Sequence, residues 1–396
     1  MNALANLTEC FAADLVVETA HEERCEVIVP RDDPDWHVAL EGAWRDLGRN
    51  AVEPNVFFEY DFLVPSLREM ARDDDVRIVT LWCGSTLVGL CPITSAKSFP
   101  RIPIRTASIW LHEHMFFAAP LVRPGFEEAF WSQLIAAVER QWWGGIFRTP
   151  KVLFEGKLSD ALERVCRAEG RAYQVLNASE RAMIAVPDDA EAYWRETVSK
   201  KRRKELARQY RRLEDLGELR FGAVCDTQDL DFWIDEFLQL EASGWKGEGG
   251  TALNQDPPTV RFFRDAVHGA ARSGKLQIVH CRLDDKTIAM IVNFMTQDGG
   301  FGFKTAFDED YYHFSPGVQL QRELLGRLKD RNVAWMDSCA SQDHPMIDGL
   351  WRGRRKLGVF AVGLKGAGRP QFAAAFLMAS RLYRRFRSYK IERRDS

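Results

Sequence analysis

Residues 77–94 read RIVTLWCGSTLVGLCPIT, and residues 277–294 read QIVHCRLDDKTIAMIVNF. Each segment consists of an apolar run, a short polar turn and a second apolar run, which is the pattern of two paired β-strands. A helical pattern precedes each segment, at residues 61–72 and 259–272. The same elements in the same order indicate that the chain contains a repeated unit.

Each predicted hairpin is followed by a Pro-Gly dipeptide that opens a helix. The first helical segment is RPGFEEAFWSQLIAAVER (123–140), and the second is SPGVQLQRELLGRLKDR (315–331). A strand pattern follows each helix, near residues 151–155 and 333–337. Strands that alternate with helices are typical of α/β folds, so the sequence predicts two copies of one α/β unit.

The two helices differ in the charge of their first turn. Glu127 and Glu128 open the first helix, whereas the second has no acidic residue before Glu323. Because acidic residues normally compensate the positive potential of a helix N-terminus, the second helix is predicted to bind an anion such as phosphate, and the first to have lost such a site. The alternative is that Ser315 merely caps a helix that begins with proline. The predicted ligand-binding residues are Ser315, Gly317, Val318, Gln319 and Leu320.

Residues 194–217 read as one long basic helix between the halves, ending near Gly217. Eight Lys and Arg residues face three acidic residues between positions 199 and 216. Between these positions Tyr210 is the single aromatic residue, and no DNA-binding motif is present, so DNA is not an expected partner. The two interpretations are a solvated linker and a clamp for phosphate beside the second unit.

The 396 residues are enough for two domains. Eight scattered cysteines without a Cys-x-x-Cys pair indicate reduced thiols rather than disulfides or a zinc site. His112 and His114 lie two residues apart on a predicted strand without a third ligand, so no metal is expected. No signal peptide and no apolar run of ~20 residues are found, which predicts a cytoplasmic protein.

The C-terminal region is strongly basic. Residues 350–396 hold 13 Lys and Arg against two acidic residues, a charge of +11, which leaves −14 for the rest of the net −3. Residues 370–391 are predicted to form a helix with Phe372, Phe376, Leu382 and Phe386 on one face and arginines on the other. This composition favours peripheral contact with an anionic membrane. The alternative is a helix docked on the protein's own surface.

Several motifs in order resemble those of bacterial GNAT-superfamily acyltransferases of the CelD/BioF2-like type, which are related to the Fem transferases. They include LEASGWKGEGGTAL (240–253), FKTAFDEDYYHFSPGVQL (303–320), WMDSCASQDHP (335–345) and LWRGRRKLG (350–358). The resemblance covers roughly residues 50–365. It implies an α/β (α+β) fold with tandem GNAT-like domains, mixed sheets flanked by helices, and here a C-terminal amphipathic helix.

The resemblance also implies a division of the chain. The expected parts are an N-terminal extension (1–50), a first GNAT-like domain (51–185), a basic linker helix (186–217), a second, catalytic GNAT-like domain (218–366) and a basic amphipathic tail (367–396). An acyl donor would bind between the strands at 301–307 and 333–337. Phe314 and Gln319 depart from the usual loop that holds coenzyme A, which leaves acyl-CoA, an acyl carrier protein or aminoacyl-tRNA as donors. No permanently bound cofactor is expected.

Acyl transfer to an amine needs a base, a stabilised oxyanion and a proton for the leaving thiolate. His344 is the predicted base, because histidine titrates near neutral pH. Asp337 would orient the base or bind the amine, and Lys304 is a charge inside an apolar strand. Asp308 and Tyr311 precede the phosphate loop, and Tyr311 would protonate the thiolate. The loop after Glu241, with Trp245 and Lys246, would cover the acceptor; each of these residues also has a purely structural interpretation.

The predicted function is N-acyl transfer from an acyl thioester to an amine at the inner face of a membrane, with a long-chain lipid amine such as a sphingoid base as one acceptor. The enzymatic alternative is a Fem-like transferase that uses charged tRNA. The non-enzymatic alternative is an accessory protein of polysaccharide or cellulose biosynthesis.

Overall fold

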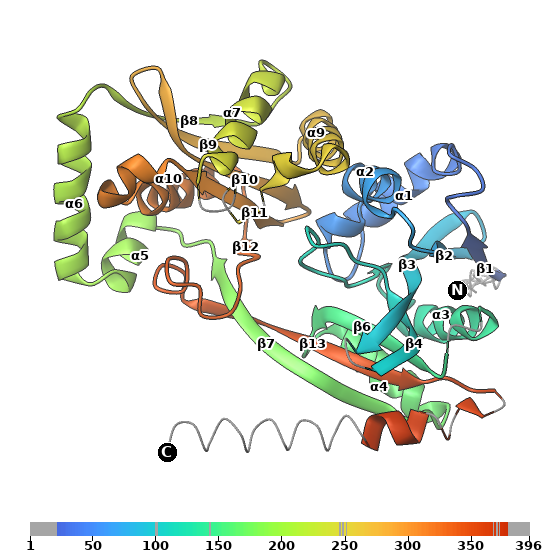
Figure 1. Ribbon diagram of the computed structural model, residues 1–396. Helices are drawn as coiled ribbons and strands as arrows, with labels where there is room; N and C mark the ends of the chain where they lie inside the picture. The colour runs from blue at the N-terminus through green and yellow to red at the C-terminus, as the bar shows by residue number, and fades with distance from the viewer. Residues whose placement is uncertain are drawn as a thin grey trace, which may run out of the picture.

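The structure, a computed structural model, describes residues 22–99, 102–141, 144–244, 247, 249–250, 252–366, 368–369, 371 and 373–378. Thirteen strands of these residues form one mixed sheet in the order β1-β2-β3-β4-β6-β13-β7-β12-β11-β10-β9-β8, and β5 pairs with β3 (Figure 1). Helices flank the sheet in both halves. The predicted fold class, an α/β fold with mixed sheets flanked by helices, is confirmed.

The first half contains the hairpin predicted at residues 77–94, which β2 and β3 form around a turn at Gly84 (φ 57°). The elements of this half are β1 (Glu23–Ile28), η1 (Val38–Leu40), α1 (Glu41–Arg49), η2 (Val56–Phe58), α2 (Tyr60–Met70), β2 (Val76–Cys83), β3 (Thr86–Phe99), β4 (Ile102–Ile109), β5 (Leu121–Val122), α3 (Glu127–Arg140), β6 (Ile146–Leu153) and α4 (Lys157–Ala168).

The second half contains the hairpin predicted at residues 277–294, which is formed by β9 and β10. The remaining elements are β7 (Tyr173–Ala185), α5 (Ala190–Thr197), α6 (Lys200–Glu214), β8 (Leu219–Val224), α7 (Leu230–Ala242), η3 (Leu253–Gln255), α9 (Pro257–Arg272), β9 (Leu276–Leu283), β10 (Lys286–Thr296), β11 (Gly299–Phe307), η4 (Glu309–Phe314), α10 (Pro316–Asp330), β12 (Trp335–Asp337) and β13 (Gly353–Gly363).

The two halves repeat one connection. In the first half β4 leads through α3 to β6, and β4 and β6 pair in parallel. In the second half β11 leads through α10 to β12, and these strands also pair in parallel. A helix between two parallel strands is the connection that a parallel pair requires, and its recurrence is the structural counterpart of the repeat in the sequence.

The halves also exchange strands. The strand β7 pairs with β12 through Met183, Ile184 and Ala185, whereas β13 pairs with β6. These two long strands pair with each other along most of their length and run together across the molecule (Figure 1). Outside the sheet, α2 packs along α9, and the ion pair between Glu69 and Arg261 (2.8 Å) links these helices. The two halves therefore share one continuous sheet.

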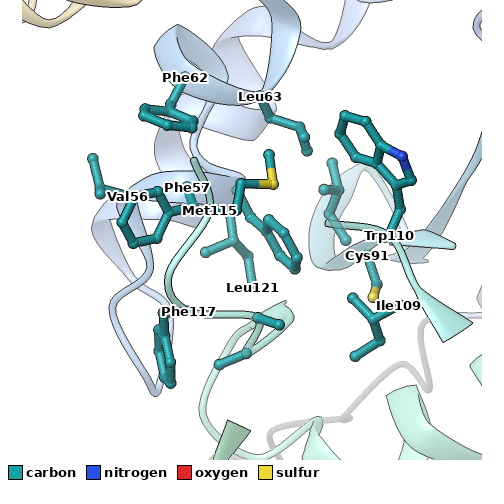
Figure 2. Close-up of a cluster of buried hydrophobic side chains, with 14 of the residues drawn as sticks. Val56, Phe57, Phe62, Leu63, Cys91, Ile109, Trp110, Met115, Phe117 and Leu121 are labelled. Carbon is teal, nitrogen blue, oxygen red and sulfur yellow. The ribbon is translucent and has the colours of Figure 1, made fainter. Parts of the chain in front are cut away.

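The space beside β6 in the first half is filled by apolar side chains. The chain leaves β4 after Ile109 and returns alongside β6, where the N–H of Ala118 donates to the carbonyl of Lys151 (3.0 Å). Trp110, Met115 and Phe117 from this segment are buried in the core of the first half (Figure 2). Close packing of such side chains leaves little room for a ligand between β4 and β6.

Two local predictions are wrong. The basic helix expected over 194–217 is two helices, because the chain is extended at Val198 and the Ser199 hydroxyl begins α6 by accepting from the N–H of Arg202 (3.3 Å). The segment of His112 and His114 is a turn after β4 rather than a strand.

The start of the C-terminal tail is docked on the sheet. Residues 373–378 are helical, and Ala373, Phe376 and Leu377 are buried against Ile146 and Ala361. Phe376 therefore contacts protein and is not available to a membrane. Phe372, Leu382 and Phe386 lie outside the described residues. In the part of the chain that the structure describes, no helix has the length and apolar character to cross a membrane.

Candidate functional site

A pocket opens where β11 and β12 separate. The parallel pairing between them covers only Gly299–Phe301 against Trp335–Asp337. After Asp337 the chain turns away through Cys339 (φ 54°), while β11 continues to Phe307. The resulting pocket has a volume of about 650 Å³ and a mainly apolar lining.

The strand β11 is irregular at the pocket. Lys304 pairs with Val292 and Gly302 with Asn293, so Phe303 is an extra residue without a direct partner on β10. Such a bulge bends a strand and leaves backbone groups outside the regular ladder. Gly302, Phe303, Lys304 and Thr305 all line the pocket. The bulge therefore brings backbone N–H groups next to the pocket, as an oxyanion site requires.

The N-terminus of α10 forms the opposite wall. Ser315 is in the left-handed region (φ 52°), its side chain makes no capping hydrogen bond, and the first turn contains no acidic residue. Gly317 lines the pocket, and a β-carbon at this position would lie 3.3 Å from Sδ of Met346. In α3, by contrast, Glu127 accepts a hydrogen bond from the N–H of Gly125 (2.8 Å). The N-terminus of α10 thus keeps the positive potential that favours an anion.

The structure brings together five of the predicted site residues around this pocket: Lys304, Ser315, Gly317, Val318 and His344. Leu320 is buried in the core instead, and the Gln319 amide donates to the carbonyl of Leu206 in α6 (2.9 Å). These two residues support the helix rather than the pocket wall.

Asp308 and Tyr311 lie elsewhere. Both line a separate groove between α7, the β9–β10 turn and η4. Asp308 begins η4 by accepting from the N–H of Asp310 (3.0 Å) and forms an ion pair with Lys286 (2.5 Å). Tyr312, the next residue, lines the main pocket. A proton donor from this segment would therefore be Tyr312 rather than Tyr311.

Asp337 belongs to a buried charge cluster. Its Oδ1 lies 2.6 Å from Nε of Arg181 and accepts from the N–H of Cys339 (2.9 Å), and its Oδ2 accepts from Arg355 (3.0 Å). Burial alone would raise the pKa of Asp337, but the charges of Arg181 and Arg355 outweigh it and hold the pKa below its ordinary value. The carboxylate stays ionised with both oxygens engaged, which suits a frame for the pocket rather than a base.

His344 lines the pocket near its rim. Its Nδ1 accepts hydrogen bonds from the N–H groups of Met346 and Ile347, at 3.4 Å each. An accepting Nδ1 in a neutral imidazole leaves the proton on Nε2. This arrangement favours a ring that donates a hydrogen bond from Nε2, and removal of a proton from the acceptor amine would first require this tautomer to change.

Lys304 is paired with Glu241 across the edge of the pocket. Nζ of Lys304 lies 3.5 Å from Oε1 of Glu241, and both side chains are largely buried. Oε2 of Glu241 accepts from the N–H of Leu253, which anchors the end of the loop that joins α7 to α9. Trp245 and Lys246, in the same loop, lie outside the described residues.

Sequence reasoning missed several residues of this site. Phe116 comes from the first half, and Arg181 and Arg355 come from the exchanged strands. No local sequence pattern predicts these long-range contacts. Gln321 could have been found, because it is a buried polar residue on the apolar face of α10 and lines the pocket.

Comparison with known proteins identifies the second half. Residues 200–344 match the family model of the acetyltransferase (GNAT) domain. This part of the chain is similar to GNAT domains. This match confirms the predicted enzyme class, a GNAT-type N-acyltransferase, and the pocket between β11 and β12 lies within the matched domain, apart from Phe116 and the last residues of its rim. No curated protein sequence matches the chain.

Solved structures extend the likeness to both halves. The crystal structure of FemX is 9% identical with a TM-score of 0.55, over 81% of this chain and 95% of that chain. The C-terminal domain of a putative lysylphosphatidylglycerol synthetase from Agrobacterium fabrum is 15% identical with a TM-score of 0.52, over 87% and 96%. A protein of unknown function from Bacteroides thetaiotaomicron is 12% identical with a TM-score of 0.53, over 84% and 98%. At these identities the likeness concerns the fold, and the finer CelD/BioF2-like assignment stays a prediction.

Proposed function

We propose that the pocket between β11 and β12 binds an acyl thioester and that the GNAT domain transfers its acyl group to an amine. One observation carries the proposal. The pocket lies where β11 and β12 separate, and it is also lined by the N-terminus of α10, whose first turn contains no acidic residue. The N-terminus suits a phosphate of the donor, and the apolar lining suits its acyl chain.

In the proposed reaction the amine nitrogen attacks the thioester carbonyl. A C–N bond forms, the C–S bond breaks, and the amine gives up one proton while the thiolate gains one. Backbone N–H groups at the bulge around Phe303 would stabilise the oxyanion. The proton lost by the amine is the one that the thiolate gains: the Tyr312 hydroxyl, which can accept and donate, is proposed to pass it on, and His344 is proposed to donate a hydrogen bond from Nε2 to the leaving sulfur.

For the acceptor, we propose a long-chain lipid amine, such as a sphingoid base, as the first compound to test. The apolar side chains of the pocket, such as Phe116, Phe307 and Ile347, would accommodate long alkyl chains. Peripheral contact with an anionic membrane is part of this proposal. It rests on the basic tail beyond residue 378, because the preceding turn of helix is docked on the protein.

The experiment that tests this function is amide formation followed by mass spectrometry. Purified protein is supplied with thioesters of increasing acyl length and with short-chain and long-chain amines. An amide product whose yield depends on the protein supports the proposal. Hydrolysis without amide formation, or no consumption of any thioester, contradicts it.

A further inference from the structure

The helix α6 presents a dense positive surface beside the pocket. It carries eight Lys and Arg residues within Lys200–Glu214. Figure 1 shows α6 standing at the side of α10. Its inner face is fixed there, because Leu206 receives the bond from Gln319 and the Arg212 guanidinium lies over the Phe314 ring (5.9 Å). The helix that carries the positive side chains therefore packs against α10 and η4, and both of these elements contribute residues to the pocket lining.

Most of this charge has no internal counter-charge. Within the part of the chain that the structure describes, Arg208 is the one basic residue of α6 in an ion pair, with Glu205 at 2.6 Å. Lys200, Lys201 and Lys204 are exposed. Eight like charges on fifteen residues oppose helix formation, so an external polyanionic partner would relieve this repulsion.

The two aromatic residues that lie on or against α6, Tyr210 and Phe314, do not suit recognition of RNA. Tyr210 is stacked on Phe221, with ring centroids 6.2 Å apart and planes 8° apart. Phe314 is covered by Arg212. Proteins that bind single-stranded RNA offer exposed aromatic faces to the bases, and neither ring is available for this. A row of positive side chains on one helix fits an acidic helix of another protein better.

The first turn of α10 has few N–H groups left for phosphate. The N–H groups of Val318 and Gln319 both donate to the carbonyl of Ser315, at 3.0 and 3.1 Å, and Pro316 has no N–H. Coenzyme A carries three phosphates, two of them in a diphosphate, whereas a phosphopantetheine group on a carrier protein has one phosphodiester. The remaining donor, the N–H of Gly317, suits the single phosphodiester of a phosphopantetheine group better than the three phosphates of coenzyme A.

A buried acceptor in the pocket fits the arm of such a donor. Gln321 is 5% exposed and lines the pocket, and its Oε1 has no hydrogen-bond partner among the described residues. A buried carbonyl without a partner is unfavourable, so a ligand that supplies an N–H would bind favourably. The pantetheine arm carries two amide N–H groups.

We infer that the acyl donor is a phosphopantetheine thioester on an acidic carrier protein, which docks on α6 and inserts its arm between β11 and β12. The inference rests on the proposed acyl transfer and names its donor. After the reaction the thiol remains on the arm of the carrier. Lys201, Arg208 and Arg212 fall within one face of α6, and Arg212 of this row lies over the ring of Phe314, two residues before α10 begins.

The test compares three thioesters of one acyl group: an acidic acyl carrier protein, coenzyme A and free pantetheine. The variant Lys201→Glu/Arg208→Glu reverses two charges on α6. The control Lys157→Glu/Arg167→Glu makes the same change of net charge on α4, where Arg167 also pairs with a neighbouring glutamate. Binding of the carrier to the full chain is measured by fluorescence anisotropy at low salt, and kcat/KM is measured for each donor.

We expect the α6 variant to bind the carrier at least tenfold more weakly. We also expect it to lower the ratio of kcat/KM for carrier thioester over pantetheine thioester by at least tenfold, while the α4 control changes neither. Equal losses in both variants, or a wild-type protein that does not bind the carrier, would overturn the inference. A higher kcat/KM for acyl-CoA than for the carrier thioester would also overturn it. The same holds if the protein binds charged tRNA and the charge-reversal variant of α6 abolishes that binding.

A second variant tests the arm. Gln321→Leu should raise KM for the pantetheine thioester at least fivefold, whereas Gln321→Glu, which keeps an acceptor oxygen, should retain most of the wild-type KM. Equal KM values for wild type and Gln321→Leu would contradict the role of Gln321. If no thioester is consumed but the carrier still binds through α6, the proposed reaction fails while the docking surface stands.

Discussion

Asp337 and Arg181 form an ion pair at the end of β12, with Oδ1 and Nε 2.6 Å apart and the carboxylate fully buried. Arg355 joins from β13 at 3.0 Å, and its guanidinium lies 4.5 Å from the centre of the Phe117 ring. The last residue of β12 is thereby tied to both exchanged strands. The charge cluster fixes where β12 ends, and the pocket begins at that point.

Removing the charge of Asp337 should destabilise the whole protein. Asp337→Asn leaves two buried guanidinium groups without their anion, and breaking such a cluster costs about 3–5 kcal/mol. Chemical denaturation should show this loss in the free energy of unfolding. The control Glu163→Gln breaks an exposed pair with Arg167 (2.9 Å) and should cost less than about 0.5 kcal/mol. Similar losses in the two variants would show that the cluster does not hold the fold.

Glu53 should make the stability depend on pH near neutrality. Its Oε1 accepts from the N–H of Leu158 at the start of α4 (3.0 Å), and its Oε2 has no partner among the described residues. Burial raises the pKa of Glu53 to about 7. The pKa of Glu53 is thus higher in the folded protein than in the unfolded chain. The stability that protonated Glu53 contributes is therefore fully present below about pH 4.5 and is lost as the pH rises through about 7.

The matching variant is Glu53→Gln, which keeps the acceptor for Leu158 and cannot ionise. Relative to wild type it should gain stability between pH 5 and pH 8, by on the order of 1–3 kcal/mol. Urea denaturation at four pH values measures the difference. A constant difference across this range would mean that Glu53 does not titrate there.

His344 can be tested with two substitutions. His344→Ala should lower turnover by roughly 10²–10⁴ if the ring moves a proton in the reaction, with little change in donor binding. His344→Asn keeps an oxygen that can accept from Met346 and Ile347 and so preserves the loop. Loss of turnover in both variants indicates chemistry by the ring. Normal turnover in the Asn variant would limit His344 to shaping the loop.

Single and double variants of Lys304 and Glu241 can distinguish a structural role of Lys304 from a functional one. Lys304→Met should lower stability, because Glu241 loses its cationic partner, and should lower turnover at least tenfold if the ammonium acts on the substrates. The double variant Lys304→Met/Glu241→Gln should regain stability without regaining turnover. Recovery of both in the double variant would show that the pair only supports the loop between α7 and α9.

The local parts of this fold could be predicted from the sequence. The hairpins at 77–94 and 277–294 and the helix after Pro316 follow from hydrophobic period and from turn and breaker residues, which act over a few positions. The exchange of β7 and β13 could not be predicted, since strand partners far apart in the chain leave no local signal. The same holds for Arg181, which lies 156 residues before Asp337. Ser199 is a residue type that often caps helices, so the break before α6 could have been predicted. The continuous run of basic residues after it favoured one uninterrupted helix instead.

The most direct test of the central claim, that the N-terminus of α10 binds the phosphate of an acyl donor, compares Gly317→Asp with Gly317→Asn. Both variants add similar bulk beside Met346, but only aspartate adds a negative charge at the positive end of the helix. The dissociation constants of acyl-CoA and of a carrier-bound thioester should be at least tenfold higher for the Asp variant than for the Asn variant, a difference of about 1.4 kcal/mol. Glu127→Gln, at the start of α3, should leave both constants unchanged. Equal affinities of the Asp and Asn variants, with both folded, would contradict the claim.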